Sequence, residues 1–203
     1  MRQFILLLIL SSTSFTTRAQ TNNWTENDRK YLLDNLTRSR DNLVNQVDKL
    51  TEKQWRFKES SERWSINEVV EHVAIYELLF QRLVSQSLAS KPQPELIKSS
   101  QPDSTYFNFI MELKPHYSLE YTKPFTFTIP MGLNDGVNNL KWFLKLRNES
   151  LDYLNTTKDD LRVFYLTPDR PNVHQIYIWA FGHVVRAIRQ IEKIKEHPNY
   201  PKS

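Results

Sequence analysis

Two histidines lie where a helical protein could bind a metal ion or a polar ligand. His72 lies at the margin of the apolar stripe of one helical segment, and His183 lies between Ala180 and Ala187 in the stripe of another. A single histidine on an apolar face is more often a hydrogen-bonded core residue than a ligand. Two such histidines on separate helices are more informative, because bundle cores build metal sites from facing helices. A catalytic divalent site needs at least three protein ligands, and helical periodicity identifies two.

The other histidines carry weaker signals. His116 lies in an irregular middle segment and His197 at a helix end, where we expect solvated side chains. His174 opens the last helical segment, so we expect it to be a cap or a surface residue. Ser65 has no neighbouring histidine and acid in the arrangement of a nucleophile with its base, and we expect it to cap a helix. Catalytic residues therefore stay unassigned, and no glycine-rich cofactor-binding motif is present.

Composition excludes several classes of protein. The chain has 203 residues, 39% of them hydrophobic, with a formal net charge of +4, three glycines and no cysteine. The absence of cysteine excludes disulfides, cysteine-ligated zinc and iron–sulfur clusters. The length fits one domain. Basic residues are scattered among acidic ones, so we expect no binding to nucleic acid.

The first nineteen residues have the layout of a secretory signal peptide. Arg2 provides a positive start, residues 4–10 form an unbroken apolar run, and Ala19 ends a small and polar region suited to cleavage. An uncleaved anchor and an ordinary buried strand are the alternatives. The run is too short to span a bilayer, and no later segment is long enough. We therefore predict export, with a periplasmic or secreted protein that has no stable membrane anchor after cleavage near Ala19.

Apolar periodicity predicts four amphipathic helices in a domain over 27–197. Thr25 with Asp28, and Ser65 with Glu68, resemble capping boxes at the starts of the first two. Because a modest loop joins these two helices, we expect them to be antiparallel neighbours. The expected helices cover residues 27–51, 65–90, 137–155 and 173–196.

The long middle segment, residues 91–136, interrupts this pattern with several prolines. We expect one helical turn at 110–113 and an extended piece at 122–130, with Phe125, Phe127 and Ile129 on its apolar face. A structureless loop of this length is uncommon, so we predict an ordered crossover wrapped on the bundle. Such a crossover allows the second and third helices to run parallel or to lie diagonally. The fold class is all-α, a four-helix bundle with a long crossover between helices two and three.

Several motifs resemble the signature of the DinB-like (DinB/YfiT) superfamily. They are residues 55–58 (WRFK), 63–72 (RWSINEVVEH) and 181–191 (FGHVVRAIRQI), with Arg147 and the tail 198–201 fitting the same pattern. The resemblance implies a four-helix bundle with a long crossover. It also implies a divalent metal, often nickel or zinc, held by three histidines. These correspond to His72, His183 and position 187, which here is Ala187.

The implied three-histidine site is therefore incomplete, because alanine has no donor atom. His174 cannot replace the missing ligand, because nine residues of helix place it about 13 Å along the axis from His183. Glu68, which lies one turn before His72, and a ligand from the crossover such as His116 stay open as third ligands.

Buried polar and aromatic residues near these positions have structural and functional interpretations. Arg147 lies on a helix face that should be buried and needs an acid or carbonyl partner, unless it anchors an anionic ligand. Glu71 and Glu77 flank His72, and we expect them to be solvated or to orient the imidazole. We expect Trp64 and Trp179 to anchor the core.

The function that follows has three forms. A ligand-binding bundle would hold a small molecule near His72, His183 and Ala187, without metal. A structural bundle would retain the histidines as a degenerate metal site and form contacts such as a homodimer. The alternative is a divalent-metal-dependent transferase or hydrolase, with zinc or nickel bound by His72 and His183 and a third ligand from elsewhere.

Overall fold

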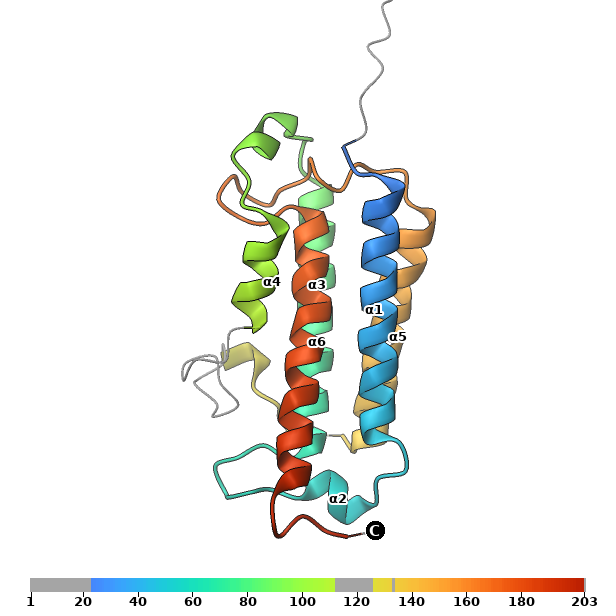
Figure 1. Cartoon of the computed structure of the whole chain (residues 1–203), viewed down its shortest axis with the longest axis vertical. Coiled ribbons are helices and arrows are strands. Elements are labelled where there is room, and N and C mark those ends of the chain that lie inside the picture. Colours follow the sequence, from blue (N-terminus) through green and yellow to red (C-terminus); the bar gives the residue numbers. More distant parts are fainter. Residues whose placement is uncertain (1–22, 112–125, 133, 203) are drawn as a thin grey trace, which may run out of the picture.

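The computed structural model describes residues 23–111, 126–132 and 134–202 (Figure 1). In this part of the chain the regular elements are all helical, and a single isolated β-bridge joins Tyr165 to Asn172. The predicted all-α class is confirmed. The elements are α1 (Glu26–Val47), α2 (Glu52–Arg56), α3 (Ile66–Leu88), η1 (Pro94–Lys98), α4 (Asp103–Met111), η3 (Thr126–Thr128), α5 (Gly136–Thr156) and α6 (Val173–Glu196).

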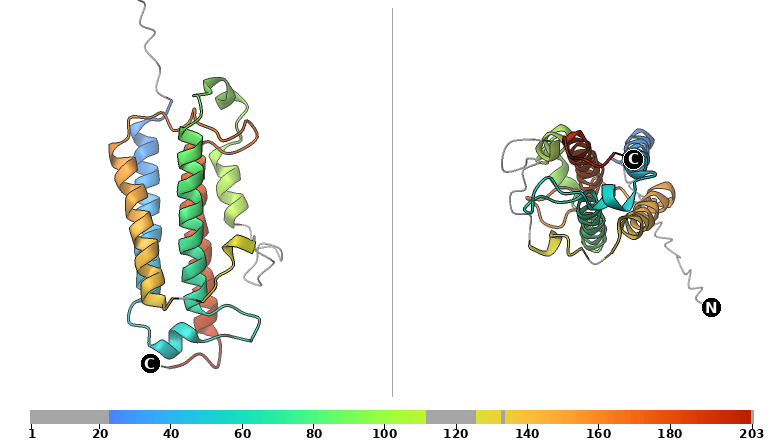
Figure 2. Two further views of the ribbon diagram at one scale, coloured as in Figure 1. Left: turned by 180° about the vertical axis from the view of Figure 1, so that it is seen from behind. Right: turned by 90° about the horizontal axis from the view of Figure 1, so that it is seen from below.

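The four long helices α1, α3, α5 and α6 form the bundle. Each of α1 and α3 packs against both α5 and α6, so the four axes form a square with two diagonal pairs (Figure 2). Helices α3 and α5 run in one direction, and α1 and α6 run in the other (Figure 1). The predicted bundle with a long crossover is confirmed, and its second and third helices are parallel neighbours.

The first two long helices are antiparallel, as predicted (Figure 1), but the prediction that they are neighbours is wrong. Helices α1 and α3 occupy diagonal corners of the square instead of adjacent ones (Figure 2). The connection between them contains α2 and passes across the end of the bundle (Figure 1). This connection is long enough to reach the far corner, which a short loop could not do.

Local signals located most helix boundaries. Helix α6 covers the predicted 173–196, and the capping boxes at Thr25 and Ser65 are both present. The first helix is shorter than expected, because Lys49 adopts a left-handed conformation with φ 59° after the end of α1. Thr51 then caps the separate helix α2 with Gln54 as its capping-box partner.

The described part of the crossover differs from the prediction. Residues 103–111 form helix α4, where we expected only a turn at 110–113. Helix α4 packs on α6 over Gly182, where an added Cβ would lie 2.4 Å from a methyl carbon of Ile110. The expected extended piece contains the short helix η3, and Phe127 and Ile129 are exposed instead of forming a buried face. Phe125 lies outside the described residues.

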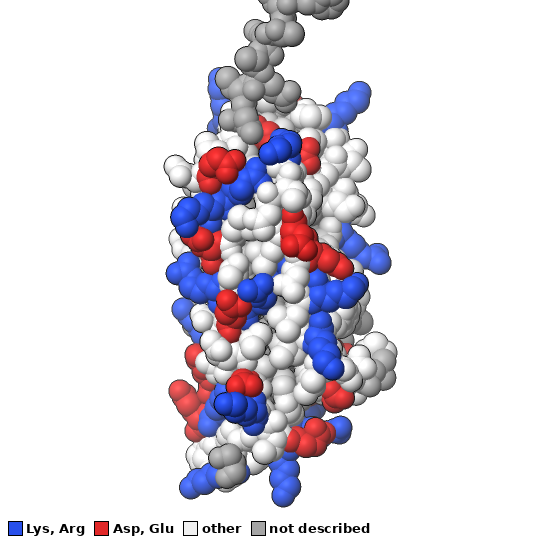
Figure 3. Space-filling view, turned by 90° about the vertical axis from the view of Figure 1, so that its right-hand side faces the viewer, with Lys and Arg blue, Asp and Glu red and all other residues white. Residues whose placement is uncertain are grey.

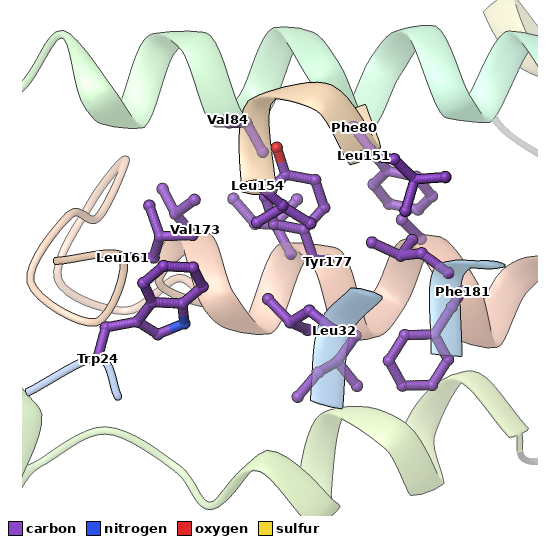
Figure 4. Close-up of a cluster of buried hydrophobic side chains, with 14 residues drawn as sticks. Trp24, Leu32, Phe80, Val84, Leu151, Leu154, Leu161, Val173, Tyr177 and Phe181 are labelled. Carbon is purple, nitrogen blue, oxygen red and sulfur yellow. The ribbon is translucent and has the colours of Figure 1, made fainter. Parts of the chain in front are cut away.

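The core consists of two apolar clusters stacked along the bundle. One contains Trp24, Tyr177 and Phe181 with side chains from all four long helices (Figure 4). The other surrounds Trp55 and Phe143 near α2. On the outer face formed by α1 and α5, basic and acidic side chains are intermixed (Figure 3). Among the described helices, none has both the length and the apolarity needed to cross a bilayer.

Candidate functional site

The fold brings the two predicted histidines together. His72 lies on α3 and His183 lies on α6, and these helices are neighbours in the bundle. Their ring centroids are 5.1 Å apart, and the rings are inclined at 51°. The residues are 8% and 9% exposed, so both imidazoles are nearly buried.

Aromatic rings enclose this histidine pair. Tyr76, one turn after His72 on α3, stacks on His183 with centroids 4.2 Å apart. Trp64 lies 4.8 Å from His72, and Phe80 lies 6.2 Å from His183, both measured between ring centroids. The histidines therefore lie in apolar surroundings, where a hydrogen bond between an imidazole nitrogen and a ligand is stronger than in water.

Hydrogen bonding leaves imidazole nitrogens available. His72 Nδ1 lies 2.7 Å from the carbonyl oxygen of Thr128. Because a carbonyl only accepts, Nδ1 carries the hydrogen, and Nε2 of the neutral ring presents its lone pair. His183 makes no hydrogen bond with any residue that the structure describes, and its contacts are with rings. The site therefore offers nitrogen lone pairs from two facing helices.

Electrostatics keep both imidazoles neutral near pH 7. Burial lowers the pKa of His72 to about 4, although its hydrogen bond with Thr128 acts in the opposite direction. Burial also lowers the pKa of His183 well below its usual range, with smaller contributions from His72 and Arg186. A neutral ring is the form that accepts a hydrogen bond or coordinates a metal ion.

The third position of the implied metal site holds no ligand. Ala187 is 2% exposed and packs within the apolar cluster near α2. Glu68 is engaged elsewhere, because it caps α3 at Ser65 and pairs with Lys58 at 2.7 Å. His116 lies outside the described residues. Within the described ranges, no group of three histidine, aspartate or glutamate side chains could hold a metal ion. These residues therefore do not complete a three-ligand metal centre.

The expectation for His174 is wrong. Its side chain is 1% exposed, and the residue that caps α6 is Asn172. The indole Nε1 of Trp24 donates to His174 Nδ1 at 3.1 Å, and His174 Nε2 lies 3.2 Å from a carboxylate oxygen of Asp103. His174 thus ties the start of α1 to α4 and α6, far from the histidine pair. His197, at the end of α6, is half-buried beside Phe57.

Arg147 is completely buried and has the acid partner that its position requires. Its guanidinium donates to both carboxylate oxygens of Glu77, each at 2.7 Å. Further donors reach the carbonyl oxygens of Leu36 and Ala180 and the hydroxyl of Ser39. The group therefore links α1, α3, α5 and α6, and its donors leave none for an anionic ligand. Glu77 orients Arg147 and makes no hydrogen bond to His72.

Sequence reasoning missed the role of Glu71. This carboxylate is 6% exposed and is neither solvated nor bonded to a histidine. Its two oxygens accept the backbone N–H groups of Met131 and Gly132 at 2.8 and 2.9 Å. The one sequence signal for this role was the position of an acid on a helix face whose neighbouring residues are buried. The backbone groups that it binds lie about sixty residues away, so the spacing of residues in the sequence could not identify them.

The expected core role of two tryptophans holds in part, since Trp64 and Trp179 are half-buried at the edges of the core clusters.

A separate surface groove of about 540 Å³ lies between α1 and α5. Arg40 and Asn148, which hydrogen bond to each other at 2.9 Å, are among its lining residues. The groove contains no histidine and lies away from the candidate site.

The fold and the paired histidines define a class of helical bundle with imidazoles from facing helices at one site. The family model of the DinB superfamily matches residues 35–191. The chain belongs to the DinB superfamily.

One solved structure supports the same fold assignment. It is YfiT from Bacillus subtilis, described as a probable metal-dependent hydrolase with an unusual four-helix bundle topology. The two chains are 15% identical, the match covers 87% of this chain and 91% of YfiT, and the TM-score is 0.56. This likeness establishes the fold. The search of curated proteins returned no match.

Proposed function

We propose that this chain is a ligand-binding member of the DinB superfamily whose site is the His72–His183 pair, acting without the family's three-histidine metal centre. One observation carries the proposal. Two buried neutral imidazoles present unengaged nitrogens beside Ala187, which provides no third ligand. A ligand that donates to these nitrogens forms hydrogen bonds in surroundings of low polarity, where such bonds are stronger than in water.

The surroundings indicate the chemistry of the ligand. Imidazole lone pairs accept hydrogen bonds, so the ligand carries an O–H or N–H donor. Trp64 and Tyr76 provide aromatic surfaces for an apolar part of the ligand. A small molecule that combines an O–H or N–H donor with an apolar part meets these requirements.

A second candidate function is a divalent-metal-dependent transferase or hydrolase. The centroid separation of 5.1 Å would suit a shared metal ion, because two imidazoles on one tetrahedral ion have centroids about 5 Å apart. The carbonyl partner of His72 Nδ1 is also typical of metal-ligating histidines. The resemblance to YfiT favours the same function. Zinc or nickel would act there as a Lewis acid, and the third ligand must come from outside the described residues.

We also propose that the protein is exported and acts in the periplasm or outside the cell. The contacts of Asn23 and Trp24 support this proposal, since both side chains are fixed within four and five residues of the expected cleavage site after Ala19. Asn23 donates to Asp160, and Trp24 donates to His174. Cleavage near Ala19 would therefore leave the contacts of the folded domain intact. A homodimer and the absence of nucleic-acid binding stay predictions.

The deciding experiment compares metal with organic ligands on the same protein. Purified protein is exposed to zinc, nickel, manganese or iron, desalted and subjected to elemental analysis, for the wild type and for His72→Ala and Ala187→His. In parallel, thermal unfolding is measured with a panel of small hydroxy acids, amino acids and phenolic acids. We expect an essentially metal-free wild type, metal uptake by Ala187→His, and a ligand-dependent rise in Tm that His183→Phe abolishes.

His197→Ala is the matched control, because this half-buried histidine lies at the far end of α6. It should leave both readouts unchanged. Stoichiometric metal in the wild type that is lost in His72→Ala would overturn the proposal and support the metal-dependent enzyme. A wild type that takes up neither metal nor any panel compound would leave the structural bundle as the function.

A further inference from the structure

Helix α3 holds the end of the crossover against the bundle through polar side chains. Asn67 Nδ2 donates to the carbonyl oxygen of Asn134 at 2.9 Å. One turn later, Glu71 accepts the N–H groups of residues 131 and 132, and His72 donates to Thr128. We call residues 128–132 the strap. It lies directly on the histidine that forms half of the candidate site.

Glu71 is the charged contact in this attachment. Each of its two oxygens accepts one backbone N–H, from Met131 at 2.8 Å and from Gly132 at 2.9 Å. Gly132 has φ 67°, a left-handed conformation that glycine adopts without steric cost. Turns of this kind can direct successive N–H groups toward one anionic group. Charge-assisted hydrogen bonds are about twice as strong as neutral ones.

Apolar packing contributes little to holding the strap. Ile129 is 43% exposed and Met131 is 73% exposed, so two of its large side chains face outward. Thr128 is completely buried, and its carbonyl oxygen is the acceptor for His72. Polar contacts to α3 therefore help to fix the position of this carbonyl.

The carbonyl of Thr128 determines which nitrogen of His72 is available to a ligand. As long as it accepts from Nδ1, the ring is held as the Nδ1–H tautomer, and Nε2 faces its environment as an acceptor. Without this contact, a neutral imidazole favours the Nε2–H tautomer, which would donate at the same nitrogen. The strap thus decides whether the site offers a lone pair or a hydrogen at Nε2.

We propose that Glu71 is the latch of the strap: by binding Met131 and Gly132, Glu71 positions the Thr128 carbonyl, which fixes His72 with Nε2 as the binding nitrogen. This inference rests on the proposed function for the identity of the site, and it adds the residue that controls that site. Glu71 acts through the strap, so it is a positioning residue that does not itself contact the ligand.

The test reads the tautomer of His72 without any ligand. Protein labelled with [15N]histidine is examined by long-range 1H–15N correlation spectra at constant neutral pH, as wild type and as Glu71→Gln. The amide of glutamine retains one acceptor and turns an N–H₂ group toward the other strap N–H. We expect the Nδ1–H pattern of His72 in the wild type and a large shift toward Nε2–H in Glu71→Gln.

Glu68→Gln is the matched control, because Glu68 lies on the same helix but contacts Ser65 and Lys58 instead of the strap. It should leave the tautomer of His72 unchanged. If Glu71→Gln fails to fold, Met131→Pro provides the second variant, since proline removes one strap donor and leaves α3 intact. A smaller shift of the same sign is expected from it.

An unchanged His72 tautomer in a folded Glu71→Gln or Met131→Pro would overturn the latch. That result would leave the proposed ligand site standing. Conversely, a ligand panel without binders would overturn the proposed function while the tautomer shift could still be present. The two failures are therefore distinguishable.

Discussion

Two buried polar groups lie at the centre of this bundle and differ in how far their hydrogen bonds are satisfied. The ion pair of Arg147 with Glu77 is almost completely buried, and the guanidinium also donates to groups on α1 and α6. The pair of His72 with His183 makes one hydrogen bond, to Thr128, within the part of the chain that the structure describes. All donors of the Arg147 guanidinium therefore have acceptors, whereas the histidine pair retains nitrogens without a hydrogen-bond partner among the described residues.

The difference follows from how each side chain responds to burial. Arginine stays charged at any ordinary pH, so its burial requires an acid and further acceptors. Histidine escapes the cost of a buried charge by losing its proton, as the lowered pKa values of both histidines indicate. A buried group whose donors and acceptors all have partners cannot bind a ligand, and its role is structural. A neutral group with a free hydrogen-bonding atom can bind a ligand.

Breaking the ion pair of Arg147 with Glu77 should have the largest effect on the stability of the protein. Glu77→Ala leaves the guanidinium of Arg147 buried without its acid, which is expected to lower the free energy of unfolding by about 3–5 kcal/mol. Urea unfolding at pH 7 measures this loss. The control is Glu149→Ala, which removes an exposed ion pair with Lys145 on the same helix as Arg147 and should cost less than about 1 kcal/mol. Similar small losses in both variants would contradict the architectural role.

Acidification should weaken the protein through the histidine pair. The pKa of His72 is about 4 in the folded state against 6.5 for the free side chain. The unfolded chain therefore binds more protons between these values, and stability falls as the pH falls from about 6.5 to 4. The loss from His72 alone is on the order of 3 kcal/mol.

Urea midpoints at pH 7, 5.5 and 4.5 measure this dependence. His72→Phe combined with His183→Phe should flatten the profile over this window, because both groups with a lowered pKa are removed. His197→Ala should leave the profile as in the wild type. A double variant with the wild-type slope would show that other groups cause the acid sensitivity.

The smallest effects are expected from single replacements of the histidines by phenylalanine at pH 7. His183 gives up no hydrogen bond, so His183→Phe should change the free energy of unfolding by less than about 1 kcal/mol. His72→Phe leaves the buried carbonyl of Thr128 without its donor, which costs about 1–3 kcal/mol. Parallel urea titrations of the two variants measure the difference. Equal costs would contradict the assignment of the single hydrogen bond to His72.

The sequence predicted the features that depend on nearby residues. Helix α6 and the caps at Thr25 and Ser65 were located because periodicity and capping act within one or two turns. Helix α4 was missed, because it depends on contacts with α6 and on the space that Gly182 leaves for Ile110. The exposure of Phe127 was missed for the same reason, since the strap that follows it is held by polar groups of α3.

The sequence by itself determined four amphipathic helices, a long crossover, the resemblance to the DinB superfamily and the absence of a donor at Ala187. The tertiary structure alone decided that α1 and α3 lie diagonally, that His72 faces His183, and that Glu71 holds the strap. The physical reason is the distance along the chain between the residues that interact. Helix propensity, periodicity and capping act between residues a few positions apart, whereas helix neighbours and the partners of buried polar groups depend on contacts between segments that are mostly far apart in the chain.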